Sequence, residues 1–332
     1  MDIVYFHKKR VKGGMSIEEN FQPLIGKMKE TNSVMQYNVP YYAGSNPFKM
    51  LKNILFIRKH STKNGINHIT GDIHYGVLGL IGRKSVLTIH DDYAIRQIKK
   101  GGLLNKAFKW LFWYFFPIKL ADAAVCTTPT TFKNISNLYN SPKLCIITHH
   151  CLPPIFKNKS KPINKLCPSL LQLGTDNNKN LETTLKVVSR LKCKLIVLKP
   201  MTELQHKMAE RLKIDYENKY DLPFEEVVAE YDKCDIVLFP SLFEGLGMPI
   251  IEGQAAGKPV ITSDLEAMNW TAGDSAHLLK NPLDEEEYYN ALVKVIMDDD
   301  YRDSLISKGF ENIKRFSLNR AFENYIKLYN TL

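Results

Sequence analysis

Residues 240–259 read PSLFEGLGMPIIEGQAAGKP, and this stretch decides the fold class. It follows the short apolar run 236–239, which has the length of a buried strand. Pro249 suits the first position of a helix, because its missing N–H would find no partner there. Gly257 then predicts the end of that helix, and Pro259 the start of the next strand. The stretch therefore predicts a strand, a glycine turn, a helix and a second strand.

Two glutamates and two glycines surround the turn. Gly245 and Gly247 lie where the helix begins, and the free N–H groups and dipole of a helix N-terminus attract a phosphate. Small residues let that phosphate approach the backbone. Glu244 and Glu252 would repel a phosphate, but they can accept hydrogen bonds from the hydroxyls of a ribose or sugar ring. The pattern therefore indicates a sugar nucleotide. The alternative is a plain strand–turn–helix unit in which a glutamate favours the helix dipole.

Strand-length apolar runs alternate with helical patterns along the whole chain. Strands are predicted at residues 2–6, 86–90, 123–127, 144–148, 169–174, 194–199, 235–240 and 259–263, and helices at 180–191, 224–233 and 284–297. Strands separated by helix-length crossovers predict parallel sheets covered on both faces. A chain of 332 residues is long for one core, and residues 153–168 have the composition of a linker. The sequence therefore predicts two doubly wound α/β domains.

The charge is divided unevenly. Residues 1–160 hold 23 Lys and Arg against 8 Asp and Glu, whereas the remainder holds 22 against 27. A basic half favours an anionic partner such as lipid, a phosphorylated acceptor or nucleic acid; lysines that serve only solubility are the alternative. No stretch reaches the roughly 20 apolar residues of a spanning helix, and the start does not resemble a secretory signal. With six scattered cysteines, these features predict a cytoplasmic protein.

The stretch 240–260 resembles the E-x7-E signature of the retaining GT-B glycosyltransferases of family 4. The match holds at Pro240, Ser241, Glu244, Gly245, Gly247, Pro249, Glu252, Ala255, Gly257, Pro259 and Val260. The resemblance implies the GT-B fold, with two Rossmann-like doubly wound parallel-sheet domains and a cleft between them. An acceptor-binding domain would comprise residues 1–160 plus about 316–332, and residues 161–315 would form the nucleotide-sugar-binding domain.

The resemblance also implies roles for single residues. Glu252 would hold the ribose hydroxyls, and Glu244 would act in catalysis by holding the hydroxyls of the transferred sugar. The donor diphosphate would meet Lys179 and the backbone of Gly245, Leu246, Gly247 and Met248. Gly174 and Thr175 fall in the family's strand–glycine turn. Family members commonly carry an arginine where this chain has Thr175, so one phosphate contact differs.

The first half carries fewer marked residues. Gly13 and Gly14 precede a capping-box spacing, and the resemblance assigns this glycine loop to the donor phosphates and the acceptor. A capped helix with no ligand is the alternative. His90 ends the predicted strand 86–90, where a histidine of the family contacts the reacting sugar. A structural histidine is the alternative there.

The segment 99–122 interleaves lysines with aromatic side chains. Lys106, Lys109, Trp110 and Trp113 suit an interfacial helix on anionic lipid, and a buried crossover helix is the alternative. We expect one helix to serve both purposes. The acceptor surface would then lie at the inner face of the cytoplasmic membrane, and the protein would be peripheral there.

The implied activity is transfer of a sugar, with retention, from a UDP, GDP or ADP sugar to a glycan or polyprenyl-diphosphate-linked acceptor, as in cell-surface polysaccharide or glycolipid synthesis. No cofactor and no metal are expected. His149 and His150 alternate in direction and lack a third ligand, and residues 298–300 end a helical segment away from any strand terminus. The rival classes are another sugar-nucleotide enzyme, either an epimerase or a phosphorylase, and a non-catalytic basic binder of nucleic acid or lipid. No nucleic-acid motif supports the latter, so no nucleic-acid partner is expected.

Overall fold

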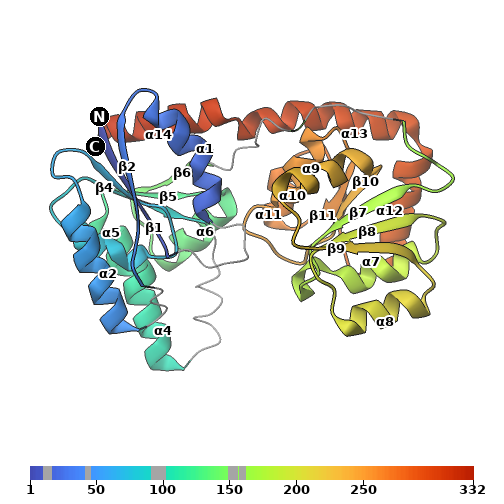
Figure 1. Ribbon diagram of the computed structural model, residues 1–332, viewed down its shortest axis with the longest axis horizontal. Helices are drawn as coiled ribbons and strands as arrows, with labels where there is room; N and C mark the ends of the chain where they lie inside the picture. The colour runs from blue at the N-terminus through green and yellow to red at the C-terminus, as the bar shows by residue number, and fades with distance from the viewer. Residues whose placement is uncertain (10–16, 42–45, 91–101, 149–155, 157–161) are drawn as a thin grey trace. The chain divides into compact units, whose positions relative to one another are not determined.

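The computed structural model describes the chain of 332 residues except residues 10–16, 42–45, 91–101, 149–155 and 157–161 (Figure 1). The chain divides into two compact units. Unit 1 comprises residues 1–151 and 318–332, and unit 2 comprises residues 152–317. The sequence placed these boundaries at 160/161 and 315/316, so the first of them lies nine residues earlier in the structure than expected (160 − 151 = 9).

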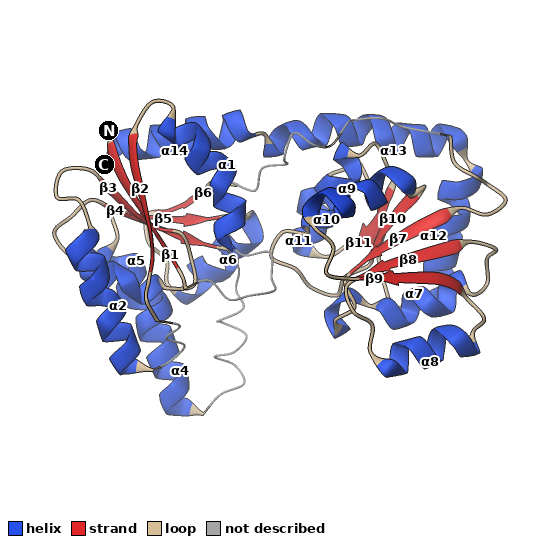
Figure 2. Ribbon diagram, viewed as in Figure 1, coloured by secondary structure: helices blue, strands red, loops and turns tan. Residues whose placement is uncertain are grey.

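Unit 1 is a parallel sheet with helices on both faces (Figure 2). Its strands are β1 (Asp2–His7), β2 (Ser33–Asn38), β3 (Ile66–Ile69), β4 (Ser85–Ile89), β5 (Ala123–Cys126) and β6 (Leu144–Ile146). Its helices are α1 (Ile17–Lys29), α2 (Pro47–His60), the 3-10 helix η1 (His74–Leu80), α4 (Leu103–Lys109), the π-helix η2 (Trp110–Phe115), α5 (Phe116–Leu120), α6 (Pro129–Leu138) and α14 (Leu318–Thr331).

The six strands of unit 1 follow the order β2-β1-β3-β4-β5-β6. Successive side chains of a strand point to opposite faces, and β1 is buried on both. Val4 and Phe6 pack with α2, η1 and α5, whereas Ile3 and Tyr5 pack with α1 and α14. The strand order reverses at β1 and β3, and the carboxyl ends of these strands therefore meet at a switch point, where such sheets bind ligands.

The carboxyl-terminal helix α14 is joined to the sheet of unit 1 by a buried polar network. His68, on β3, contacts the Tyr329 hydroxyl through Nδ1 at 2.6 Å and the Thr88 hydroxyl through Nε2 at 2.7 Å. Tyr325 reaches the same Thr88 hydroxyl at 3.3 Å, and Tyr5 reaches Tyr329 at 3.2 Å. Burial lowers the pKa of His68 well below its usual value, and His7 and His90 lower it further. The imidazole is therefore neutral where the helix docks.

Unit 2 repeats the layered design. Its strands are β7 (Ser169–Leu173), β8 (Lys194–Leu198), β9 (Asp215–Lys219), β10 (Ile236–Phe239), β11 (Val260–Ser263) and β12 (His277–Leu279). Its helices are η3 (Asn177–Lys179), α7 (Leu181–Val188), α8 (Glu203–Arg211), α9 (Phe224–Lys233), α10 (Met248–Ala255), α11 (Glu266–Ala272), α12 (Glu285–Met297), α13 (Asp299–Asn312) and η4 (Ile313–Phe316).

The strand order of unit 2, β12-β11-β10-β7-β8-β9, is that of Rossmann domains. The chain builds outward from β7 to β9 and then restarts on the other side with β10. One face of the sheet packs with α7, α8, α12 and α13, and the other with α9, α10 and α11. The loops after β7 and β10 therefore leave the sheet side by side, which makes this the switch point of unit 2.

The structure confirms the predicted fold class and each of the eight predicted strands to within two residues at either end. Four strands were missed. Their sequences explain why: β2 and β9 are half-exposed edge strands with polar residues, β3 (INHI) buries Asn67 and His68, and β12 spans three residues. Each lacks the apolar run or regular alternation on which strand prediction depends.

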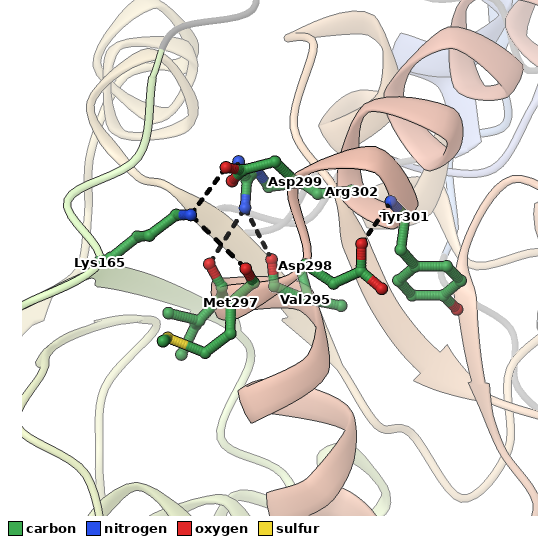
Figure 3. A network of polar contacts seen from close by, with 8 residues as sticks. Lys165, Val295, Met297, Asp298, Asp299, Tyr301 and Arg302 are labelled. Carbon is green, nitrogen blue, oxygen red and sulfur yellow. Dashed lines mark hydrogen bonds and ion pairs between the residues drawn. The ribbon is translucent and has the colours of Figure 1, made fainter.

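The acidic run 298–300 forms the junction between α12 and α13 (Figure 3). Asp298 caps α13 by accepting a hydrogen bond from the Tyr301 N–H at 2.9 Å. Asp299 pairs with Lys165 at 2.7 Å and with Arg302, whose guanidinium also donates to the Val295 and Ile296 carbonyls at 3.1 Å. The run was predicted to end a helical segment, and it does. Arg302, which pairs with Asp299, ties α13 to the last turn of α12.

Candidate functional site

Two loops meet at the switch point of unit 2. The η3 segment after β7 and residues 240–247 after β10 are joined by a hydrogen bond from the Leu242 N–H to the Asn178 carbonyl, at 2.7 Å. The Asn178 side-chain amide donates to the Phe243 carbonyl and to Glu244 Oε1, both at 3.2 Å. Asn178 therefore fixes one loop against the other and holds the Glu244 carboxylate from one side.

The two predicted site residues Lys179 and Glu244 form an ion pair. Lys179 Nζ lies 2.5 Å from Glu244 Oε1, and both side chains are largely buried, with 21% and 15% exposed. The ammonium also lies 5.0 Å from the centroid of the Phe239 ring. A pair with little water around it interacts more strongly than a surface pair. The sequence assigned these residues to different parts of a ligand, and the structure brings them together.

Gly174 makes room for the lysine. It has φ +92°, and a Cβ atom there would lie 2.7 Å from Lys179 Cγ. Any other residue would be strained and would push the lysine stem away. Thr175, where family members commonly carry an arginine, donates its hydroxyl to the Pro200 carbonyl at 2.6 Å. That bond places the end of β8, with Lys199, beside the Gly174 turn.

Residues 245–248 form a glycine turn at the start of α10, as predicted. Gly247 has φ +89°, and Pro249 lies in the first helical turn, which no side chain of the described residues caps. Leu246 is buried, and its carbonyl accepts a hydrogen bond from Thr271 Oγ1 at 2.5 Å. The turn is therefore held by packing, and the N-terminus of α10 keeps backbone N–H groups for an anion.

Glu252 lies one turn into α10 and is buried, with 6% of its surface exposed. Tyr231, on α9, donates its hydroxyl hydrogen to Glu252 Oε2 at 2.5 Å. Burial raises the pKa of the Glu252 carboxyl, and the Tyr231 hydrogen bond offsets this only in part. Burial and the neighbouring Glu252 raise the pKa of Tyr231 well above its usual value. Sequence reasoning missed this pairing, although Tyr231 lies in the predicted helix 224–233.

His90 follows β4 at the carboxyl edge of the unit 1 sheet and is half-buried. Its Nε2 lies 2.5 Å from the Thr70 carbonyl and must therefore carry the hydrogen. In the neutral ring, Nδ1 is then the acceptor nitrogen. The Phe21 ring packs edge-to-face with the imidazole, and the two ring centroids are 5.9 Å apart. Gly13 and Gly14, which were assigned to the donor phosphates and the acceptor, lie outside the described residues.

A second ion pair, which the sequence did not single out, lies at the same edge. Lys8 Nζ, just after β1, is 2.8 Å from Asp72 Oδ2, just after β3. Burial alone would raise the pKa of the Asp72 carboxyl. The attraction of Lys8, aided by His74 and His90, outweighs burial and brings the pKa below its usual value, so the carboxyl is ionised. Asp72 has φ +50°, which is rare outside glycine. A spacing motif could not have revealed this pair, because 63 residues separate its two members (72 − 8 − 1 = 63).

The aromatic segment forms α4 and η2. Lys106, Lys109, Trp110 and Trp113 are all half-buried. Trp113 packs edge-on against Tyr75 at 5.4 Å, and Trp110 stacks on Phe115 at 5.0 Å. Trp113 therefore packs against the core of unit 1, as the crossover interpretation expected, whereas Trp110 stacks within its own segment.

None of the helices outside the undescribed segments combines the length and hydropathy that a bilayer crossing requires. Within the same part of the chain, no three or more His, Cys, Asp and Glu side chains are grouped so that they could hold a metal ion. His149 and His150 lie outside the described residues.

Comparison with known proteins matches residues 167–298 to the family described as "Glycosyl transferases group 1". The chain is 28% identical over 111 residues to O-antigen chain mannosyltransferase B of Escherichia coli. That match covers 33% of this chain and 29% of the relative, so it spans under a third of the relative's length. The family match lies within unit 2, where the Lys179–Glu244 ion pair and Glu252 are found.

Solved structures resemble the whole chain. Anabaena HepE, crystallised with UDP and glucose, has a TM-score of 0.77 at 13% identity, and the match covers 100% of both chains. WaaG, a glycosyltransferase involved in lipopolysaccharide biosynthesis, has a TM-score of 0.72 at 15% identity, covering 99% of both chains. At these identities the likeness concerns the fold, and the two parallel six-stranded sheets therefore define a GT-B fold.

Proposed function

We propose that this chain is a retaining glycosyltransferase of family 4 that moves a sugar from a nucleoside-diphosphate sugar to a hydroxyl of a glycan or lipid-linked acceptor. The observation that carries the proposal is the Lys179–Glu244 ion pair beside the first turn of α10, with the buried Glu252 one turn behind it. The Glycosyl transferases group 1 match covers these same residues and supports the proposal.

In this proposal the donor lies at the switch point of unit 2. The diphosphate meets the backbone N–H groups of residues 245–248 and the Lys179 ammonium, which would then be shared with Glu244. When the bond between the anomeric carbon and the diphosphate breaks, negative charge grows on the leaving oxygen, and fixed positive charge there lowers the barrier. The acceptor oxygen forms the new bond at the same carbon, and its proton passes to an oxygen of the departing diphosphate. Retention is inferred from the resemblance of Glu244 and Glu252 to the E-x7-E signature.

The acceptor is proposed to belong to cell-surface polysaccharide or glycolipid synthesis. The similarity to an O-antigen chain mannosyltransferase and the fold shared with WaaG support this choice. The basic composition of residues 1–160 suits an acceptor that carries a diphosphate. The crystals of HepE with UDP and glucose support a nucleotide sugar as the donor.

The test is a thermal-shift panel of UDP, GDP, ADP and their sugar conjugates. A nucleotide at about one hundred times its dissociation constant adds ~2.7 kcal/mol to the unfolding free energy. We expect one base to stabilise the wild-type chain, and Lys179→Met to lose most of that effect. Lys186→Met is the control, because Lys186 pairs with Glu285 on an exposed surface. If no nucleotide raises the melting temperature of the wild type, the proposal is wrong.

A further inference from the structure

Three large apolar side chains of α2 are exposed. Phe48, Leu51 and Leu55 have 77%, 54% and 59% of their surface exposed. At 3.6 residues per turn they fall within about 60° of one another around the helix, so they form one surface, the α2 stripe. In unit 2, by contrast, the exposed large apolar residues stand one to an element: Leu166, Leu204, Tyr220, Phe243, Leu283 and Met297. Scattered residues of that kind are ordinary, whereas a stripe marks an interaction surface.

The opposite face of α2 is fixed to unit 1. Met50 and Ile57 are buried there, and Asn53 is fully buried between them. The Asn53 side chain accepts from the Tyr41 N–H at 3.1 Å and donates to the Tyr41 carbonyl at 2.9 Å and the Tyr75 hydroxyl at 2.8 Å. A rotation of the helix that hid the α2 stripe would break all three bonds. The stripe is therefore held outward.

Cations flank the stripe, and α2 has no acidic residue. Lys49, Lys52, Arg58 and Lys59 are exposed on the same helix. Arg58 also donates to the Ile81 carbonyl at 2.8 Å, and Ile81 itself is 55% exposed. The surface thus combines a hydrophobic centre with a basic border. Nucleic acid would use the cations but would leave Phe48 and the leucines in water.

We propose that the α2 stripe docks unit 1 on the surface of an anionic lipid bilayer. Phe48, Leu51 and Leu55 would enter the boundary between headgroups and acyl chains, while the flanking lysines meet anionic headgroups. The lipid-facing surface then differs from the one expected from sequence, because Trp110 and Trp113 are half-buried against unit 1, whereas α2 is open. Docking through α2 involves no donor residue, so it is independent of sugar transfer.

The experiment is flotation of the full chain with phosphatidylcholine vesicles, with and without an anionic phosphatidylglycerol fraction. We expect the wild type to float with anionic vesicles at low salt and to stay behind with neutral ones. The triple change Phe48→Ser, Leu51→Ser and Leu55→Ser should lower binding by at least tenfold, which is about the loss of one fully buried apolar side chain. The matched control is Leu166→Ser, Leu204→Ser and Leu283→Ser in unit 2, which should float like the wild type.

The charge requirement is tested separately. Each cation near an anionic surface contributes about fivefold to binding, so Lys52→Gln with Lys59→Gln should weaken flotation about twenty-five-fold. Lys192→Gln with Lys207→Gln, exposed in unit 2, should leave it unchanged. The proposal would be overturned if the wild type did not bind anionic vesicles at low salt, or if the α2 triple variant floated like the wild type. The proposal would also be overturned if the wild type were a dimer that the α2 triple change converts to a monomer, because a second copy of the chain would then cover the α2 stripe. Nucleotide thermal shifts are measured on the same samples, so failure of docking is distinguishable from failure of sugar transfer.

Discussion

Lys179 and Glu244 neutralise one another across the switch point of unit 2, with Nζ and Oε1 2.5 Å apart. The two residues come from different loops, one after β7 and one after β10, and the strand order of the sheet brings them together. A diphosphate that binds Lys179 would have to share the ammonium with Glu244. If the donor binds as proposed, the pair would couple the Glu244 carboxylate to the presence of the phosphate.

Replacing Gly174 should displace the Lys179 side chain and so disturb its ion pair with Glu244. Gly174→Ala would place a methyl group 2.7 Å from Lys179 Cγ and strain a residue with φ +92°. We expect a loss of about 1–2 kcal/mol of unfolding free energy and, in the nucleotide thermal-shift assay, a loss of affinity comparable to that of Lys179→Met. Gly82→Ala is the control, because Gly82 has φ +76° but open space around its Cα. Equal nucleotide affinity in the Gly174 and Gly82 variants would contradict the coupling.

Tyr231 should act as a positioning residue for Glu252. Tyr231→Phe leaves Glu252 buried without its described donor, and such a loss costs about 1–3 kcal/mol. The pKa of Glu252, already raised by burial, should rise further in the variant. As the pH is lowered, nucleotide affinity of the variant should therefore begin to fall at a higher pH than that of the wild type. Isothermal titration across the pH range measures this. An unchanged pH profile with reduced stability would mean that Tyr231 is purely structural.

The ionised Glu252 carboxylate should lower the unfolding free energy of the chain, because it is buried. Because its pKa is raised in the folded state, the folded chain binds more protons than the unfolded chain above the ordinary glutamate pKa. Stability is therefore lost as the pH rises from about 4 towards neutrality. Glu252→Gln keeps an acceptor for Tyr231 and removes the charge, so it should be more stable than the wild type at pH 7 and similar to it at pH 4. Urea unfolding at both values tests this, and a less stable variant at pH 7 would contradict it.

We predict that Lys199 supplies a cation near Thr175, where family members commonly carry an arginine. Lys199 has φ +93° at the end of β8, a conformation that costs a lysine about 1–2 kcal/mol and costs glycine nothing. Lys199→Gly should therefore stabilise the chain while weakening nucleotide binding. Lys213→Gly, with φ +54° after α8, should give the stability gain alone. If both variants bind nucleotide like the wild type, Lys199 has no phosphate role.

His68 should make the docking of α14 sensitive to acid. Its pKa is lowered by burial, so the unfolded chain takes up a proton first as the pH falls below about 6.5. Stability is then lost on acidification by at most about 1.4 kcal/mol per pH unit for this group. His68→Gln should reduce the slope of unfolding free energy against pH between 7 and 5. Trp110 and Trp113, which lie in unit 1, report its unfolding by fluorescence, and an unchanged slope would assign the effect to other groups.

Local patterns predicted much of the fold. Eight strands were found because each carries an apolar run that parallel sheets bury on both faces. The strand β3 was missed because His68 and Asn67 make INHI look polar. Both are buried, His68 through a hydrogen bond to the distant Tyr329 and Asn67 through bonds to the Thr62 and Lys84 carbonyls. Tertiary contacts outweighed residue preference there. The glycine turn and Pro249 were placed correctly because their requirement is local.

The sequence alone determined the class of this protein: a two-domain parallel α/β chain with two carboxylates beside a helix N-terminus. Its spacing and turn chemistry suffice for that, because they act over a few residues. Only the tertiary structure decided that Lys179 meets Glu244, that Tyr231 holds Glu252, and that α2 presents three apolar side chains to solvent while Trp110 and Trp113 are half-buried. These relations depend on which strands become neighbours and which face of a helix finds a partner, and neither is encoded in a local window of residues.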